Sequence, residues 1–449
     1  MNGRRVVITG TGVVSALGMS RAELFENLLN GRSAIRRMEE WGLNLNGGFS
    51  PGAPVVLGDA AKKKIPRLFR RSMGDLSIFA SLAAMQALEE SGLEPEAVSG
   101  GRCGCVIGST MGSSKSIAEA FRMILLEHGM ADMPAAQFFK CASHTASFNV
   151  ANLLNITGCV QSASAACASG LQAVGTARCL IAYGAQDIMI CGGADELSQE
   201  VTGSFDLLYA GASEYENAPE CSSRPFDARR TGLVCGEGAG ILVLEEYEHA
   251  RKRGAEIFAE IAGYATCGCG SQISQSDASS IRRCLALAYR DAGIAADSTD
   301  YISAHATATV QGDAEEAKAL RDFFGADAVP ASSLKGHLGH TLGASGVIET
   351  IAALEMMNRG ILLPTLNLES VAEECSGVDH VRTPREHKVD VFLKNSFAFG
   401  GINAALICVA NEQERIPGLI SVLFALFAFC PPRNDFLTML FFHKFFLLF

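Results

Sequence analysis

The chain has 449 residues, of which 48% are hydrophobic and 19% are charged, with 46 glycines and only 13 prolines. This composition is typical of a folded globular protein and excludes a disordered chain, a collagen and a coiled coil. Because 37 basic side chains face 48 acidic ones, the formal net charge is -11, which argues against a broad nucleic-acid-binding surface.

The N-terminal segment MNGRRVVITGTGVVSALG has the charge order of a signal peptide, but residues 9–12 interrupt its apolar part. A strand over 5–9 that runs into a glycine turn fits the pattern better. The segment also resembles the first turn of a dinucleotide-binding fold. However, Ser15 stands where the third glycine belongs, and no acidic residue follows roughly 20 positions later on a strand end. We therefore expect no nicotinamide cofactor.

Short β-branched runs alternate with longer amphipathic segments along the chain, a pattern that indicates an α/β protein with mostly buried sheets. Strands are predicted over 5–9, 105–107, 187–191, 240–244, 257–261, 301–303 and 391–393. Helices are predicted over 21–29, 72–93, 114–127, 169–182, 279–291, 314–324 and 345–357.

The alternation occurs twice, and in each half a strand ends in a turn of small residues before a helix. The first such turn carries Cys167 and the second carries His305. Reactive groups of open α/β sheets lie at the carboxyl ends of strands, so the two turns are expected to face one site. The basic stretch HARKRGAE predicts a division into residues 1–250 and 251–412.

Cys167 is the strongest candidate nucleophile. It lies among small residues in QSASAACASGLQ, directly before a predicted helix. The helix N-terminus offers a positive dipole end and free backbone N–H groups, which are expected to lower the pKa of the thiol and to stabilise an oxyanion. On local context alone, a buried structural cysteine is an equally good interpretation.

Three histidines follow in turns of small residues. His305 closes a strand in YISAHATATVQGD, and His337 and His340 lie with Lys335 in SSLKGHLGHTLGAS. A zinc site formed by the histidines is one interpretation, although no recognised ligand pattern accompanies them. Phe397 and Phe399 lie in NSFAFGGIN, between two strand-like runs, where core aromatics beside a hairpin are the plain alternative.

From about residue 4 to about residue 410 these segments together resemble the β-ketoacyl-acyl-carrier-protein synthases. The order Cys, His, Lys, His and NSFxFGG has the spacing of the Cys-His-His elongating branch of that family, and RPFDxxRxG (224–232) and GEGAGxLVLE (236–245) also match. The resemblance implies a thiolase-like α/β fold, in which duplicated βαβαβ halves form a five-layer α-β-α-β-α sandwich.

The implied reaction is a decarboxylating Claisen condensation. Cys167 takes an acyl group from an acyl carrier protein, and malonyl carrier protein then supplies the attacking carbanion. By resemblance, His305 and His340 assist decarboxylation and stabilise the enolate, while Lys335 organises the site with Glu316 as its acidic partner. The substrates travel on the phosphopantetheine of the carrier protein, so no separate cofactor and no metal are implied.

Further roles follow from the same resemblance. The backbone N–H groups of Cys167 and Phe399 would form the oxyanion hole, and Phe399 matches a gating phenylalanine. Thr307 and Thr309 match the threonines that bind the pantetheine arm, and Met111 matches the floor of the acyl pocket. The family is dimeric, so a homodimer or a heterodimer with a related subunit is expected.

The chain departs from the family beside His305 and Phe399. AHATATVQGD replaces the usual AHGTSTPxGD, and Ala398 and Ile402 replace Gly and Thr. These changes leave substrate choice open between fatty-acid and polyketide or polyene synthesis. Two alternatives to an autonomous enzyme are a catalytic subunit that needs a chain-length-factor partner and a non-catalytic partner of that kind. The second alternative conflicts with the presence of Cys167.

Residues 413–449 form a hydrophobic tail to which we assign no role in the chemistry. Its apolar runs, 419–430 and 436–449, fall short of the roughly 18–20 residues that span a bilayer. A membrane-surface or partner-binding tail, a packed extension and out-of-frame sequence remain the alternatives, and the abrupt change in composition favours the last. The 15 irregularly spaced cysteines indicate reduced thiols in the cytoplasm. Because carrier proteins are acidic, a local Lys/Arg patch is expected near the entrance.

Overall fold

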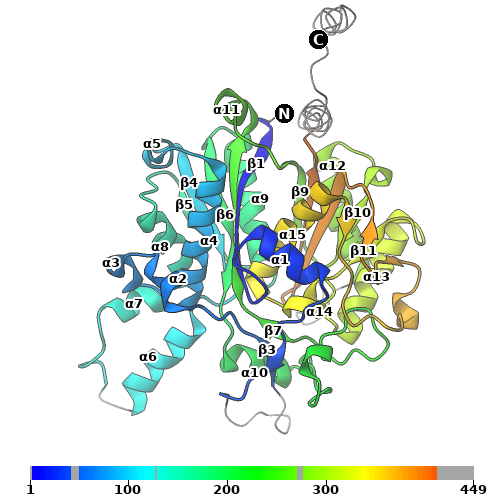
Figure 1. Cartoon of the computed structure of the whole chain (residues 1–449), viewed down its shortest axis with the longest axis horizontal. Helices are drawn as coiled ribbons and strands as arrows, with labels where there is room; N and C mark the ends of the chain where they lie inside the picture. The colour runs from blue at the N-terminus through cyan, green and yellow to red at the C-terminus, as the bar shows by residue number, and fades with distance from the viewer. Residues whose placement is uncertain (1–2, 42–49, 127–128, 271–276, 412–449) are drawn as a thin grey trace, which may run out of the picture. The chain divides into compact units, whose positions relative to one another are not determined.

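The computed structural model describes residues 3–41, 50–126, 129–270 and 277–411. Within these ranges its main sheet has eleven strands in the order β13-β11-β10-β15-β16-β9-β1-β8-β6-β4-β5 (Figure 1). The hydrophobic tail lies outside the described residues. Every helix in the described ranges is too short or too polar to serve as a bilayer-crossing segment.

The first half of the sheet holds five strands. They are β1 (Val6–Ser15), β4 (Cys103–Gly108), β5 (Val160–Ala163), β6 (Ile188–Asp195) and β8 (Gly238–Glu246). In space they run β5-β4-β6-β8-β1, with β4 parallel to both of its neighbours and β8 antiparallel to both of its own.

The second half repeats this arrangement. Its strands are β9 (Ala259–Gly268), β10 (Tyr301–Ser303), β11 (Pro330–Ser332), β15 (Val391–Ala398) and β16 (Ile402–Val409), with β13 (Asp379–His380) added at the edge. The spatial order β11-β10-β15-β16-β9 and the strand directions match those of the first half. Antiparallel pairing of β1 with β9 joins the halves. The expected duplication is thereby confirmed.

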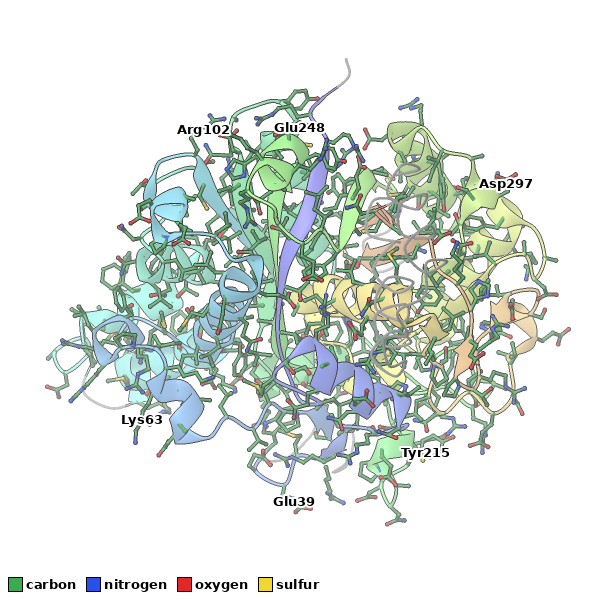
Figure 2. All side chains as sticks on the ribbon, turned by 45° about the horizontal axis from the view of Figure 1, so that its top comes forward. Glu39, Lys63, Arg102, Tyr215, Glu248 and Asp297 are labelled. Atoms are coloured by element: carbon green, nitrogen blue, oxygen red, sulfur yellow. The ribbon has the colours of Figure 1, made fainter. Side chains whose placement is uncertain are left out.

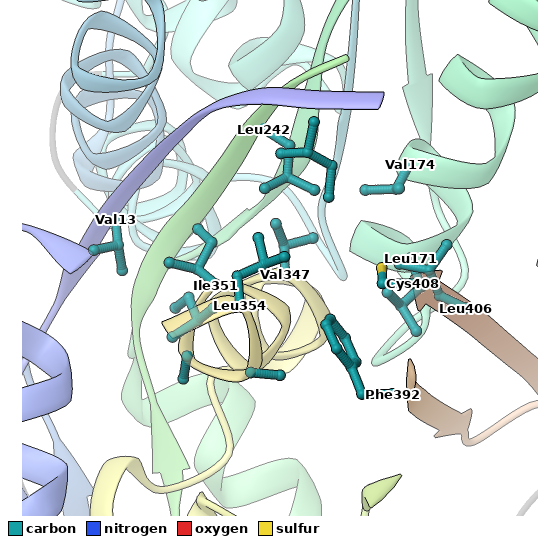
Figure 3. Packing of buried hydrophobic residues seen from close by; sticks show 14 of the residues in the cluster. Val13, Leu171, Val174, Leu242, Val347, Ile351, Leu354, Phe392, Leu406 and Cys408 are labelled. Carbon is teal, nitrogen blue, oxygen red and sulfur yellow. The ribbon is translucent and has the colours of Figure 1, made fainter. Parts of the chain in front are cut away.

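Two helices lie between the halves. They are α9 (Ser169–Ala182) and α15 (Ser345–Arg359), which contact each other and strands of the main sheet. Residues 345–356 of α15 are buried all round, as expected for a helix enclosed by sheets rather than facing water. Side chains of α15 meet Val13 and Leu242 on one side and Phe392 on the other (Figure 3).

Outer helices cover the remaining faces and complete the five layers. In the first half, α4 (Asp75–Ser91) packs on β1 and β8, and α8 (Thr145–Leu153) packs on β4. In the second half, α12 (Ala278–Ala292) packs on β9 and β16 and contacts α13 (Val310–Phe324). The Asp277 side chain caps the N-terminus of α12 by accepting the Ser280 N–H.

The other elements lie around these layers. The helices are α1 (Arg21–Leu29), α2 (Asp59–Lys63), α3 (Arg67–Arg70), α5 (Pro95–Ser99), α6 (Ser114–Leu126), α7 (Ala136–Cys141), α10 (Gln199–Leu207), α11 (Tyr247–Lys252) and α14 (Lys335–Leu338), with 3-10 turns at Pro219–Cys221, Ala296–Ser298, Leu342–Ala344 and Glu373–Cys375. The strands are β2 (Arg36–Arg37), β3 (Pro51–Ala53), β7 (Cys235–Gly236), β12 (Ile361–Leu362) and β14 (Arg385–Glu386).

Gly10 and Gly12 lie inside β1, where the backbone of α4 crosses close above the strand. A Cβ atom on Gly12 would lie 1.8 Å from the Ala83 carbonyl oxygen, and one on Gly10 would lie 2.1 Å from the Ala87 carbonyl oxygen. The glycines that resemble a dinucleotide motif therefore serve the approach of a helix to a strand.

Gly12→Ala is expected to lower the free energy of unfolding by about 1–3 kcal/mol, because α4 must move away from β1 to admit the methyl group. Urea denaturation measures the loss. Gly58→Ala is the matched control, since a Cβ atom there meets nothing within 4 Å and the Gly58 φ of -70° suits any residue. Equal stability of the two variants would contradict the packing argument.

Candidate active site

Three loops that carry the predicted reactive residues follow carboxyl ends of strands. Cys167 follows β5, His305 follows β10, and Lys335 with His340 follows β11. The nucleophile therefore comes from the first half and both histidines come from the second. Gly170 of α9 and Gly343 meet where the halves touch, because a Cβ atom on Gly170 would lie 2.4 Å from the Gly343 carbonyl oxygen.

Cys167 lies in a tight turn directly before α9. The preceding Ala166 has a φ of 45°, a left-handed conformation that costs a non-glycine residue energy and that clusters at functional sites. The Ser169 hydroxyl fixes the turn, since it accepts the Ala165 N–H at 2.8 Å and lies 3.2 Å from the Ser109 carbonyl oxygen. Only 4% of Cys167 is exposed.

Burial raises the pKa of the Cys167 thiol to about 12, although nearby Lys335 and a backbone hydrogen bond act in the opposite direction. The expectation of a lowered pKa is therefore wrong for this closed site. Removal of the thiol from water outweighs the helix N-terminus. The thiol is protonated at neutral pH and has to lose its proton during attack.

His305 and His340 face each other edge to face, with ring centroids 5.3 Å apart and planes at 83°. The Phe397 ring lies 5.7 Å from the His305 ring. Within the described residues, neither ring nitrogen of His340 has a hydrogen-bond partner, and Nδ1 of His305 also lacks one. Buried polar atoms are rarely left unpaired, so these nitrogens indicate where a polar ligand binds.

Burial lowers the pKa of both imidazoles well below the usual value, and the positive charge of Lys335 lowers each further. The two rings are consequently neutral at pH 7. A neutral imidazole can accept a proton at one nitrogen and donate a hydrogen bond from the other.

Lys335 is fully buried and its Nζ atom lies 2.7 Å from Oε1 of Glu349 on α15. The other oxygen of the Glu349 carboxylate binds the ammonium group of Lys394, which is also buried. The predicted pairing of Lys335 with Glu316 is therefore wrong. Glu349 takes that place because α15 passes directly beside the loop that carries Lys335.

Glu316 binds backbone instead. Its carboxylate accepts the N–H groups of His305 at 2.9 Å and Ala306 at 2.7 Å. Asp313 accepts the N–H groups of Thr307 at 3.0 Å and Ala308 at 3.1 Å. The GDxxE segment thus holds the turn that carries His305, including Ala308 with its φ of 69°.

Thr307 and Thr309, predicted to bind the pantetheine arm, lie in the same turn with hydroxyl oxygens 3.1 Å apart. His337 differs from the other two histidines, because both of its ring nitrogens have partners. Its ring nitrogens contact the carbonyl oxygens of Arg32 at 2.9 Å and Pro364 at 3.2 Å. Because both nitrogens contact backbone, His337 is a poor zinc ligand. No group of three or more metal-ligating side chains occurs within the described ranges.

Phe399 follows β15 and packs against an apolar cluster over the site, with its ring centroid 5.8 Å from that of Phe205. Met111, predicted as the floor of the acyl pocket, is 56% exposed in the single chain. This chain alone therefore does not enclose Met111.

Lys394, Glu349 and Asp195 are site residues that the sequence reasoning missed. Asp195 at the end of β6 accepts the Thr110 N–H at 3.0 Å and the Gly343 N–H at 2.7 Å, and so links the two halves. Burial raises its pKa to about 6. A lysine inside the apolar run VFLKNSF was the available signal for Lys394, because a lysine is rarely buried without a specific partner.

Comparisons with known proteins agree with this geometry. The N-terminal domain of beta-ketoacyl synthases matches residues 3–250, and their C-terminal domain matches residues 258–369. The 3-oxoacyl-(acyl-carrier-protein) synthase 1 of Haemophilus influenzae is 36% identical over 408 residues, which cover 90% of this chain and 98% of that one.

Solved structures give the same answer. A beta-ketoacyl synthase from Burkholderia phymatum is 42% identical with a TM-score of 0.87, and the match covers 91% of this chain and all of that one. The ishigamide ketosynthase/chain length factor is 31% identical with a TM-score of 0.85, over 91% of this chain and 100% of that one. The predicted resemblance and the thiolase-like fold are thereby confirmed, and the chain belongs to the beta-ketoacyl synthase family.

Proposed function

We propose that this chain performs its family's elongating condensation with Cys167 as the nucleophile and His305 and His340 as the decarboxylation pair. The observation that carries the proposal is that one buried cation, Lys335, acts on the buried Cys167 thiol and on both imidazoles. Three nitrogens of the two rings have no hydrogen-bond partner among the described residues. In the first half-reaction the Cys167 sulfur bonds to the acyl carbon, and the carrier-protein thiol leaves.

In the second half-reaction malonyl carrier protein loses CO2. Hydrogen bonds from His305 and His340 would stabilise the enolate oxygen, and one such donor contributes about 3–4 kcal/mol. The carbanion then attacks the acyl carbon on Cys167, which releases the thiolate and gives a β-ketoacyl carrier protein. Neutral imidazoles suit this task because their hydrogen bonds strengthen as charge develops, without a permanent ion in the site.

The remaining site residues take supporting roles in the proposal. The backbone N–H groups of Cys167 and Phe399 form the oxyanion hole, with Phe399 as the gate, and Thr307 and Thr309 bind the pantetheine arm. Met111 contributes to the acyl pocket. We also retain the division into residues 1–250 and 251–412. The substrate pathway stays open between fatty-acid and polyketide synthesis.

The cytoplasm is the proposed compartment. Cys103, Cys105, Cys191 and Cys408 are buried thiols without disulfides, and burial raises the pKa of each above the usual value. Such thiols behave as small hydrophobic residues and persist where the surroundings are reducing.

The two half-reactions should separate in variants. Cys167→Ala is expected to abolish acylation, seen as loss of the acyl adduct by intact mass, and to lower condensation about 1,000-fold or more. The same variant should still decarboxylate malonyl carrier protein, because that step uses the histidines. His340→Gln should show the reverse pattern, with acylation kept and decarboxylation lowered about 100-fold or more.

Matched controls for these variants are Cys179→Ala in the last turn of α9 and His387→Gln, whose ring contacts the Asp300 carbonyl oxygen at 3.0 Å. Both controls should behave like the wild type. An acyl adduct on Cys167→Ala would overturn the assignment of the nucleophile. Full decarboxylation by His340→Gln would overturn the role of the histidine pair.

Basic side chains supply a docking surface for an acidic carrier protein. Residues 60–74 contain no acidic side chain, and Figure 2 shows Lys63 of this segment reaching outward from α2. The cations of the segment are Lys62, Lys63, Lys64, Arg67, Arg70 and Arg71. We assign carrier-protein docking to this segment, because opposite charges steer association despite the acidic net charge of the chain.

Charge reversal tests the docking surface. The double variant Lys63→Glu/Arg67→Glu is expected to raise KM for carrier-protein substrates at least about tenfold at low salt, with a smaller effect at high salt. Acylation by a small thioester without carrier protein should not change. Lys252→Glu on the distant α11 is the control (Figure 1). Equal losses with both substrates would contradict the assignment.

An exposed apolar surface points to a dimer. Within the described residues β5 pairs only with β4, so its outer edge is open. Exposed apolar side chains occur on β5, on α7 and in the loop after β4, namely Val160, Phe138, Phe139 and Met111. A second copy that pairs along β5 would cover this edge and enclose Met111. The alternative occupant is a related subunit, as in a ketosynthase/chain length factor.

Sedimentation tests the dimer. The wild type is expected at twice the chain mass, and Val160→Glu/Phe138→Glu is expected at the single mass, because buried charges oppose association. Leu68→Glu, which alters an exposed apolar residue on α3, is the control and should stay dimeric. A monomeric wild type would overturn the homodimer and favour the heterodimeric arrangement.

A further inference from the structure

Lys394 is a buried cation to which the proposed reaction assigns no role. It lies in the middle of β15 and has no exposed surface. A buried ammonium group is costly unless it is paired and hydrogen-bonded. A buried lysine in a strand next to the active site therefore needs partners that compensate the cost of its burial.

The contacts of Lys394 lead directly to His305. Its Nζ atom donates to the carbonyl oxygens of Ser303 and Ala304, each at 3.2 Å. These are the two residues that precede His305 at the end of β10. The third partner is the Glu349 carboxylate, which Lys394 shares with Lys335. One ammonium group thus ties β15 and α15 to the turn that carries a proposed catalytic histidine.

Charged and titratable groups surround Lys394 from every packed element. They are Glu349 on α15, Lys335 on α14, Glu316 on α13, and the rings of His305 and His340. The two lysines and Glu349 together carry a net charge of +1. This charge opposes protonation of both imidazoles, and Lys394 contributes to the opposition at each ring.

We propose that Lys394 is a positioning residue for the condensation, which holds the His305 turn through two backbone carbonyls and adds its charge to the burial that keeps His305 and His340 neutral. The inference rests on the function proposed above. It differs from the role of Lys335, which approaches the site from α14 and does not contact the His305 backbone within the described contacts.

The pH dependence follows from the signs of these interactions. Burial and the charge of Lys335 lower the pKa of Lys394 to about 8, while Glu349 opposes the shift. Below pH 8 the ammonium form is present and lowers the pKa of both histidines. Above pH 8 the charge is lost. Loss of this charge has no effect on the rings above pH 8, because imidazoles are neutral there in any case. The wild type should therefore show an acid limb in decarboxylation that lies at low pH, because the histidines resist protonation.

Lys394→Met tests the proposal. Removal of the charge leaves a balanced Lys335–Glu349 pair, so folding is expected to survive. In decarboxylation, kcat should fall about 10–100-fold with little change in KM, because the histidines act after binding. The acid limb should rise by about one pH unit, a tenfold change in the proton affinity of the histidines.

Lys394→Gln separates the two parts of the role. Its amide N–H groups can still donate to the carbonyl oxygens of Ser303 and Ala304, but it carries no charge. We expect kcat closer to the wild type and the same shift of the acid limb. The control is Lys388→Met, which removes an exposed lysine paired with Asp390 at 2.7 Å and should leave the acid limb unchanged.

The outcomes distinguish this inference from the proposed function. Absence of decarboxylation in the wild type would defeat the proposed function. An active wild type together with variants of unchanged pH profile would overturn the inference alone. If neither Lys394 variant folds, as judged by near-UV circular dichroism, the lysine serves the fold rather than the chemistry and the inference also fails.

Discussion

Burial of the junction between the two halves is the constraint on which the site depends. Gly170 and Gly343 allow α9 and the loop before α15 to meet backbone to backbone, which excludes water from the thiol and the histidines. Exclusion of water raises the pKa of Cys167 and lowers the pKa of both imidazoles. The thiol and both imidazoles are therefore neutral at pH 7.

Buried carboxylates fix the loops that carry this chemistry. Glu316 and Asp313 bind four successive backbone N–H groups around His305, and Asp195 binds Thr110 and Gly343 from opposite halves. Glu349 holds two lysines at once. Buried ions of this kind contribute little net stability, but each fixes the direction of its partners. The stability of the body rests instead on apolar packing around α4, α9, α12 and α15.

Periodicity predicted the helices well because their apolar faces are repeated over several turns. The predicted helices at 21–29 and 169–182 match α1 and α9 residue for residue. The edge strand β5 was missed, since its side chains are mostly exposed and lack an apolar run. The site roles of Cys167, His305, His340 and Lys335 stay predictions from the resemblance, but the predicted Lys335–Glu316 pairing is wrong. Sequence spacing does not show which buried carboxylate a lysine contacts in the folded protein. Glu349 lies on α15, and the packing of that helix brings it to Lys335.

The two halves share one topology, but the loops at equivalent strand ends carry different side chains. In both halves a turn and a helix follow the third strand of the main sheet in chain order, which is β5 in the first half and β11 in the second. In the first half this turn carries Cys167 after β5, and in the second the equivalent segment carries Lys335 and His340 after β11. The loop after the second strand holds Met111 in one half and His305 in the other. Two copies of one βαβ arrangement, packed with their strand ends toward one site, place these groups opposite each other. Each half can then change its loop residues, as at Ala306 and Ala308 in the second half, without altering the loop that carries the other partner.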